Sequence, residues 1–374
     1  MQHPRKSLSL AVLGLGLVVA ACQWIVGIDG DLRVAPEGDA GVDASDGGAP
    51  DPCRNEGIPS VPDAASGGDI SVVFALRSLD FGIDGGAPVG LNLDGRCTCP
   101  GPGSCRAPST VPCDLERGID NGSRDLLAQV FRLGVLDQPT INRALQDGYF
   151  GALVQVDGWN GEPDDSQVRL QVFASQGFEG PVGRSQPAFD GKDIWSVDDV
   201  SVASSVDGGP PYRGVARDDG AYVSGGALVG SLSFPVIVGS SFGQRVRINV
   251  NDGRLFANIR TEKGPGDAGV QYSLRGTLAG RWPAGELLTS LASLDAPVGI
   301  PICGDSGVYQ QVKTLVCASL DIPANRNNDD VGQSCSAVSL GATFVAVNAK
   351  LGSQKPKPDS GGGCGPTWSD NCAP

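Results

Sequence analysis

The chain has 374 residues and a formal net charge of −14, with 28 basic and 42 acidic side chains. This length suits one large domain or two modest ones, and the acidic balance argues against binding nucleic acid, which requires basic patches. Aromatic residues make up only 6% of the chain, whereas glycine contributes 55 residues. This composition indicates many turns and short elements rather than long helices.

The first 21 residues are typical of a signal peptide. Arg5 and Lys6 form a short positive region, and an apolar run extends from Leu8 to Ala21. The run is shorter than the roughly 20 residues that a transmembrane helix requires. It ends at Cys22, and the order Val19-Ala20-Ala21-Cys22 resembles the lipobox of bacterial lipoproteins. An ordinary signal peptide followed by a chance cysteine is the alternative.

The lipoprotein resemblance implies a lipid anchor on Cys22. In that family the chain is cut before the cysteine, the thiol takes a diacylglycerol, and the new amine is often acylated. Two or three acyl chains give a stable hold on a membrane, unlike a single chain. Gln23 replaces the aspartate that retains many such proteins at the inner membrane. We therefore expect a cell-envelope protein at the outer membrane, with the membrane as its first partner.

The number of cysteines agrees with this interpretation. The chain has 11, and an even number remains once Cys22 carries lipid. Outside the inner membrane we expect them all in disulfides. Zinc is the alternative, but Cys97 and Cys99 have CxC spacing, and the only histidine is His3 in the signal peptide. The predicted disulfide cysteines are Cys53, Cys97, Cys99, Cys105, Cys113, Cys303, Cys317, Cys335, Cys364 and Cys372.

A mature chain without histidine cannot use several common catalytic and metal-binding mechanisms. Ser-His-Asp and Cys-His catalysis are excluded, as are metal sites built from imidazole. The commonest general base near neutral pH is also missing. The sequence therefore favours a non-catalytic protein.

Composition divides the chain after the signal peptide (1–21). Residues 22–68 are predicted to be a disordered tether, because the stretch from Pro36 to Pro52 contains almost nothing to bury. A β-rich domain stapled by disulfides is expected over 69–352. Residues 353–374 are predicted to be a flexible tail, in which Cys364 and Cys372 close a small loop.

The predicted domain opens with a strand, Ile70–Leu76, and a cysteine-rich stretch from Gly90 to Asp125. Proline, glycine and serine separate its cysteines, so we expect disulfides rather than a core to order it. The segments LDGRCTC (93–99) and GIDN (118–121) resemble uncharacterised cysteine-rich lipoproteins of myxobacteria. That resemblance implies no activity.

Apolar periodicity predicts short helices at 124–133 and 140–146, with Asp137 and Pro139 at the start of the second. The pattern then turns to strands, and we expect a mainly β, antiparallel sandwich or jelly roll. The predicted strands are 152–156, 168–173, 194–202, 228–238, 246–250, 255–259 and 271–278. Asn251-Asp252-Gly253 lies between two alternating runs and predicts a hairpin.

The C-terminal part is predicted to be partly helical, over 284–294 and 306–320. Residues 335–351 fit either periodicity, and we interpret them as a short helix that turns into a strand. Cys317 is expected to pair with Cys303 or with Cys335, since sequence alone leaves the connectivity open.

Acidic residues near the cysteine-rich stretch suggest a calcium site at Asp94, Asp114, Asp120 and Asp125. Calcium prefers six to eight oxygen ligands from flexible acidic loops. No complete DxDxDG loop is present, however, and the same aspartates are well suited to capping helices and turns. Calcium is thus a possible cofactor, with turn capping as the alternative.

A second candidate is a sugar-binding face built on Trp159 and Trp195, with Tyr212 and Tyr222 nearby. Aromatic rings stack on sugars, but in a chain with few aromatics the same rings are needed for the core. This interpretation depends largely on analogy with other sandwich folds.

A third candidate is a hydrolase that uses paired carboxylates, as glycosidases do. Asp164-Asp165 and Asp198-Asp199 are adjacent pairs, yet neighbours on a strand point to opposite faces. The sequence thus favours a lipid-anchored, non-catalytic structural or interaction module with a glycan or protein partner in the envelope. A carbohydrate- or calcium-binding module is the first alternative, and a hydrolase is the second.

Overall fold

The computed structural model describes residues 58–99, 103–107, 113–132, 137–239, 245–263, 270–291, 304, 307–356 and 368–372. All of them belong to one compact unit, Pro50–Pro374. The predicted signal peptide and lipidation site lie outside the described residues, as do Cys53, Cys303 and Cys364.

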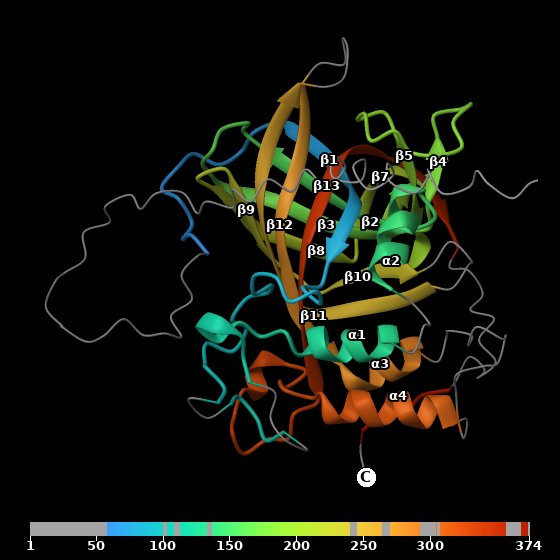
Figure 1. Cartoon of the computed structure of the whole chain (residues 1–374). Helices are drawn as coiled ribbons and strands as arrows, with labels where there is room; N and C mark the ends of the chain where they lie inside the picture. The colour runs from blue at the N-terminus through green and yellow to red at the C-terminus, as the bar shows by residue number, and fades with distance from the viewer. Residues whose placement is uncertain are drawn as a thin grey trace, which may run out of the picture. The chain divides into compact units, whose positions relative to one another are not determined.

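Eight strands close into an antiparallel barrel (Figure 1). They follow one another around the barrel in chain order, and the barrel closes because β1 pairs with both β2 and β13. The mainly β class is confirmed, but the arrangement is a barrel rather than a two-sheet sandwich or a jelly roll. The barrel strands are β1 (Ile70–Asp80), β2 (Gly151–Trp159), β3 (Asp165–Ser175), β8 (Ala216–Ser224), β9 (Ala227–Ser231), β11 (Arg245–Lys263), β12 (Val270–Pro283) and β13 (Ala337–Lys355).

Both faces of β1 are apolar because each face meets a core. Phe74 and Leu76 belong to the main core inside the barrel, whereas Ala75 belongs to a second cluster on the outer face. That cluster also contains Trp195 and Tyr212, so a second layer of chain covers this part of the barrel wall.

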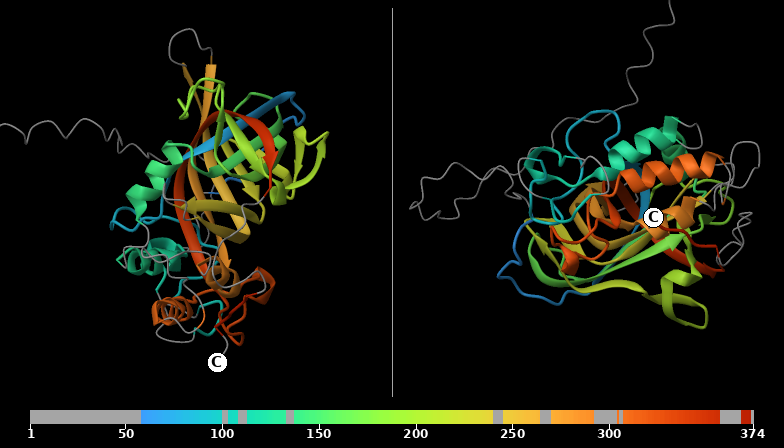
Figure 2. Two further views of the ribbon diagram at one scale, coloured as in Figure 1. Left: turned by 90° about the vertical axis from the view of Figure 1, so that its right-hand side faces the viewer. Right: turned by 90° about the horizontal axis from the view of Figure 1, so that it is seen from below.

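The second layer comes from the insertion between β3 and β8, which lies beside the barrel in Figure 2. The predicted strand 194–202 lies in this insertion, and the structure divides it into one strand, a 3-10 helix and the first residue of a second strand. The elements of the insertion are β4 (Phe178–Gly180), β5 (Ile194–Asp198), the 3-10 helix η2 (Asp199–Ser201), β6 (Val202–Val206) and β7 (Gly209–Gly214).

In the described part of the two remaining insertions lie four α-helices. The helices α1 (Gly122–Arg132) and α2 (Gln138–Gln146) connect β1 to β2, and the other pair connects β12 to β13: α3 (Ala284–Leu291) and α4 (Gly307–Ala318). All four match predicted helices, and the carboxylate of Asp137 caps α2 by accepting the Thr140 N–H at 2.6 Å. Figure 2 shows α1 and α4 side by side at one end of the barrel. Among the described residues, no helix is long and apolar enough to cross a membrane.

The Asp-Gly hairpin prediction is wrong. β11 continues through these residues for 19 residues in all, and its first half pairs with a separate strand, β10 (Phe234–Gly239). The register shifts between Asn251 and Arg254, and Asp252 has a φ of 46°. The turn residues therefore form a bulge that bends one strand, because pairing with β9, β10 and β12 overrides the local turn preference.

The helix predicted at the start of 335–351 is also wrong, because β13 occupies this region. Val338, Leu340 and Ala342 face the barrel core, alternating along the strand. Both edges of β13 are paired, one with β12 and the other with β1. These long-range pairings settle the ambiguous periodicity in favour of a strand.

The disulfide pattern differs from the predicted pairings. Cys317 pairs with Cys372, and Cys105 pairs with Cys335. Neither proposed partner of Cys317 is correct, and Cys372 does not pair with Cys364. A third bond joins Cys99 and Cys113, and Cys97 is disulfide-bonded as well. The predicted loop within the tail is replaced by a link between the tail and α4.

Both ends of the predicted domain extend further than expected. Before Asp69, the Pro59 carbonyl accepts the Tyr222 hydroxyl at 2.5 Å. After residue 352, Asp370 accepts hydrogen bonds from Tyr309 at 2.6 Å and from Lys313 at 2.8 Å. Residues 368–372 of the predicted flexible tail are thus fixed to α4.

Candidate functional site

The barrel wall opens where β1 and β13 part. The two strands pair from Val73 opposite Ala349 to Asp80 opposite Thr343. Beyond Ala349, β13 leaves β1 and runs parallel to β5. Residues 70–72 of β1 keep their pairing with β2 on one edge, while no strand in the described part of the chain pairs with their other edge. We call this opening between β1 and β13 the seam.

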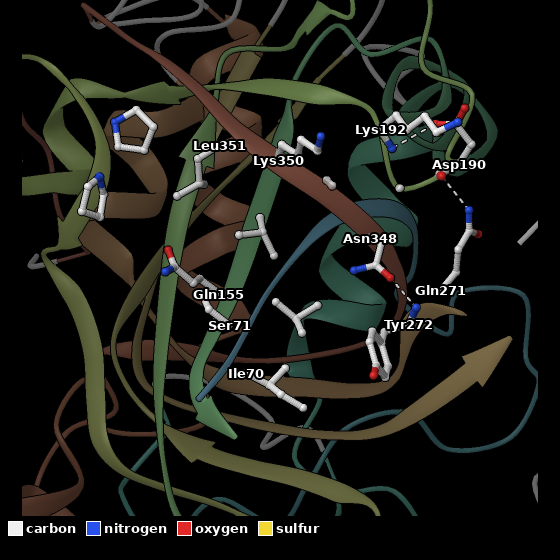
Figure 3. Close-up of a pocket in the computed structure, with 16 residues that line it drawn as sticks. Ile70, Ser71, Gln155, Asp190, Lys192, Gln271, Tyr272, Asn348, Lys350 and Leu351 are labelled. Atoms are coloured by element: carbon white, nitrogen blue, oxygen red, sulfur yellow. Dashed lines mark hydrogen bonds between the residues drawn. The ribbon is translucent and has the colours of Figure 1, made fainter. Parts of the chain in front are cut away.

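A pocket of about 770 Å³ lies at the seam (Figure 3). Its walls come from six parts of the chain: β1, β2, the loop before β5, β7, β12 and β13. We call it the seam pocket, and its lining residues are Ile70, Ser71, Val72, Val73, Gln155, Asp190, Gly191, Lys192, Pro210, Pro211, Gln271, Tyr272, Asn348, Ala349, Lys350 and Leu351.

Gln155 contributes a hydrogen-bond acceptor without a partner. Its side chain is only 7% exposed, and its Nε2 donates to Asp157 Oδ1 at 2.7 Å. Because a carboxylate only accepts, the NH₂ end of the amide must face Asp157. The carbonyl oxygen at the other end is buried and accepts no hydrogen bond from any residue that the structure describes. Leaving such a group unpaired costs about 1–3 kcal/mol, which a suitable donor would recover.

Asp157 holds this wall of the pocket in place. Besides the Gln155 amide, its carboxylate accepts the Ser71 hydroxyl at 2.5 Å and Gln171 Nε2 at 3.0 Å. The carbonyl oxygen of Gln171 in turn accepts the Gly214 N–H at 2.8 Å. The network joins β1, β2 and β3 to β7, so the Gln155 amide is fixed in its orientation.

Among the described residues that line the pocket, the charges without an ion-pair partner are positive. Lys192 and Lys350 are exposed, and neither forms an ion pair with a carboxylate in the described ranges. The acidic residue of the pocket, Asp190, binds Arg184 with its Oδ2 2.7 Å from Nη2. This hydrogen bond lowers the pKa of Asp190, so its charge is balanced locally. The residues that line the pocket therefore carry one more positive than negative charge, on a protein of net charge −14.

A hydrogen bond between elements fixes the loop that carries Lys192. Gln271 in β12 donates its Nε2 to the Asp190 carbonyl at 2.6 Å, as Figure 3 shows. Asp193 accepts the Phe189 N–H at 2.5 Å and lies 3.2 Å from Arg184. Lys192 therefore extends from a loop that these contacts hold in place.

The tryptophans of the predicted sugar-binding face are in the core, which corrects that prediction. Trp159 is 5% exposed and Trp195 is 1% exposed. Trp159 packs edge-on against Tyr272, with ring centroids 5.4 Å apart. Trp195 packs against Phe178 on the side of the second layer that faces the barrel. A barrel with two apolar clusters and few aromatics uses these rings for packing, so neither presents a face to a sugar.

The structure brings together three of the four predicted calcium ligands. Asp94 and Asp114 each raise the pKa of Asp120, whose pKa lies well above the usual range, mainly because of burial. Burial likewise raises the pKa of Asp114 to about 6. Asp125 is separate, exposed in the first turn of α1.

Each clustered aspartate accepts a backbone N–H, but only the bond of Asp94 lies within a local turn. Asp120 accepts from Leu93 at 2.6 Å, and Asp94 accepts from Arg96 at 2.8 Å. Asp114 accepts from Thr98 at 2.5 Å. Within the described ranges, no three His, Cys, Asp or Glu side chains are arranged to hold a metal ion. Calcium binding stays a prediction.

Sequence reasoning missed Asp321, which belongs to the same acidic region. It lies about 200 residues after the other aspartates, yet it raises the pKa of Asp120. Burial raises its own pKa to about 6, and it accepts the Ser339 hydroxyl at 2.5 Å. The Cys105–Cys335 disulfide and β13 bring this residue to the cysteine-rich stretch, and no local pattern indicates that.

The adjacent carboxylates of the hydrolase hypothesis have separate structural roles. Asp164 accepts the Gly225 N–H at 2.8 Å, whereas the buried Asp165 accepts the Asn160 N–H at 2.8 Å. Asp198 is buried and accepts the Val200 N–H at 3.1 Å at the start of η2. Three of the four carboxylates therefore serve as hydrogen-bond acceptors for backbone N–H groups in turns and loops.

Sequence reasoning also missed the residues of the seam pocket. The only available signal was polar residues between apolar ones in β2, where Gln155 and Asp157 alternate with Val154 and Val156. No protein-family model matches the chain, and no curated protein or solved structure matches it either.

Proposed function

We propose that this protein is a lipid-anchored component of the bacterial cell envelope, at the outer membrane. Its barrel acts as a non-catalytic binding module, and the seam pocket is its binding site. The lipobox-like sequence at Cys22 and the disulfides of the body support the location outside the inner membrane.

One observation carries the binding function: the wall of the seam pocket contains a fixed, buried acceptor, the Gln155 carbonyl oxygen, with no hydrogen-bond partner among the described residues. Buried polar groups are normally paired, and an exception within a pocket favours a ligand that supplies the missing donor. The Ser71 hydroxyl is already engaged with Asp157, which binds two amides as well.

Metabolic labelling with a palmitate analogue tests the anchor. We expect the wild-type protein to carry label and to fractionate with membranes, and a Cys22→Ala variant to carry none. Label retained in the variant would contradict the lipid assignment.

Site-specific photocrosslinking in cells tests the pocket. A lysine analogue with a diazirine at position 350, which lines the pocket, should capture a defined ligand. The matched control places it at Lys355, on the same strand and 3.0 Å from the Glu179 carboxylate. Identical adducts at both positions, or none at either, would argue against the seam pocket as the binding site.

A further inference from the structure

We propose that the ligand of the seam pocket is a short, extended peptide with a carboxylate at one end, which pairs with the free edge of β1. This inference depends on the proposed function, since it identifies the ligand class of the same pocket. Three features carry it: an unpaired strand edge, an unpaired acceptor and a cationic end.

The first feature is the strand edge at residues 70–72. A strand edge presents backbone N–H and C=O groups that another extended chain can pair with, and closed barrels normally remove such edges. Here the barrel leaves one open, because β13 turns away to β5 after Ala349. A peptide in the seam would continue the antiparallel ladder from the Val73–Ala349 pair, in the place that β13 leaves.

The length of the edge sets the length of the ligand. Three residues of strand span about 10 Å, at ~3.3 Å per residue. We therefore expect about three ligand residues to pair with β1, as in other cases of β-strand addition.

The second feature is the chemistry of the wall beside this edge. The Gln155 carbonyl oxygen requires a donor, and a peptide supplies N–H groups along its whole length. Val73, Leu351 and Pro211 provide apolar surface for its side chains. An aliphatic chain would leave both the β1 edge and Gln155 unpaired, so these groups favour a peptide over a lipid tail.

The third feature is the positive charge of Lys192 and Lys350, which line the pocket and form no ion pair with a described carboxylate. On an acidic protein, an unbalanced cationic site selects an anion by charge complementarity. The lining carboxylate, Asp190, is bound to Arg184 and forms no ion pair with either ammonium group. The C-terminal carboxylate is the group that these two ammonium ions would bind in a peptide.

The test uses the purified full-length protein in detergent. Three pools of N-acetylated tetrapeptides of random sequence are compared: one with free C-termini, one amidated, and one N-methylated along the backbone. We expect the free-carboxylate pool to be retained at least tenfold more than either of the other two. Amide hydrogen exchange should slow at one of the two adjacent amides, Ser71 or Val72, because neighbouring N–H groups on a strand point to opposite edges and only one of them faces the peptide. Charge attraction alone would not produce this protection.

Variants assign the binding to the proposed groups. Lys192→Gln with Lys350→Gln should reduce retention about tenfold, and Gln155→Leu should also reduce it, while Lys355→Gln should leave it unchanged. An unchanged melting temperature shows that each variant is folded. The inference would be overturned if the N-methylated pool were retained as well as the free-carboxylate pool. It would also be overturned if Lys355→Gln reduced retention as much as the pocket variants do.

The outcomes separate this inference from the proposed function. If Lys350 photocrosslinks to a ligand that is not a peptide, and no tetrapeptide pool is retained, the inference fails while the pocket remains a binding site. If neither experiment gives a ligand, both proposals fail.

Discussion

Arg281 and Asp329 form a buried, two-point ion pair. Their Nη1–Oδ1 and Nη2–Oδ2 distances are 2.5 and 2.7 Å, and the Arg281 side chain is 1% exposed. Arg281 Nη1 also donates to the Pro323 carbonyl at 2.9 Å. The guanidinium extends from β12 and fixes the segment that contains the 3-10 helix η3 (Arg326–Asn328). This one side chain therefore connects the barrel to the irregular chain before β13.

Breaking this pair should destabilise the protein strongly. Asp329→Asn removes the charge that compensates a buried guanidinium, and such losses cost about 3–5 kcal/mol. Chemical denaturation measures the change in the free energy of unfolding. As a control, Asp219→Asn removes the partner of Arg169, an exposed pair, and should cost no more than about 1 kcal/mol. Similar losses in both variants would contradict the structural role of Arg281.

The Cys105–Cys335 disulfide should contribute more stability than Cys99–Cys113. The two bonds join residues separated by 230 and 14 positions, respectively, and a longer closed loop restricts the unfolded chain more. Replacing both cysteines of the longer link by alanine should lower the free energy of unfolding by about 2–5 kcal/mol. Denaturation of each double variant compares them. A larger loss from the shorter link would count against this chain-entropy argument.

The helices could be predicted because the residues that determine each of them are close together in the sequence. The apolar stripe of α1 and the Asp137 cap of α2 both lie within a few turns of chain. Barrel closure depends instead on the pairing of Val73 with Ala349, and strand propensity says nothing about which distant strands meet. The Asn251-Asp252-Gly253 sequence shows the converse, since a strong local turn signal gave way to pairing on both sides of β11.

The candidate site was beyond sequence reasoning for the same reason. Six separate parts of the chain line the seam pocket, and the opening exists only because β13 changes partner after Ala349. Gln155 is visible in the sequence as a polar residue in an apolar strand. That its carbonyl oxygen lacks a partner follows only from the position of Asp157.

Trp195 should behave as a core residue. Its ring is 1% exposed between the barrel wall and the second layer, beside Phe178 and Phe189. Trp195→Ala should lower the free energy of unfolding by about 3–5 kcal/mol, because it leaves a large cavity. Thermal denaturation followed by near-ultraviolet circular dichroism measures this change. A variant that keeps its stability but loses glycan binding would restore the sugar-face hypothesis.

Stability should fall as the pH rises through about 6. The pKa of Asp114 is about 6 in the folded protein, raised from 3.8 by burial, so the folded state holds its proton more tightly than the unfolded state does. The resulting stabilisation is complete below about pH 4 and is lost above pH 6. Since Asp114 is only partly buried, we expect about 1–2 kcal/mol from this group after solvent screening.

Denaturation at pH 4.5 and pH 7.5 measures this effect, with Asp114→Asn expected to reduce the difference. Asp125→Asn is the matched control, because Asp125 is an exposed aspartate of the same stretch. If Asp114→Asn leaves the pH difference as large as in the wild type, Asp114 is not the titrating group. Adding calcium at pH 7.5 tests the predicted metal site as well, since a cation bound at Asp94, Asp114 and Asp120 would restore the lost stability.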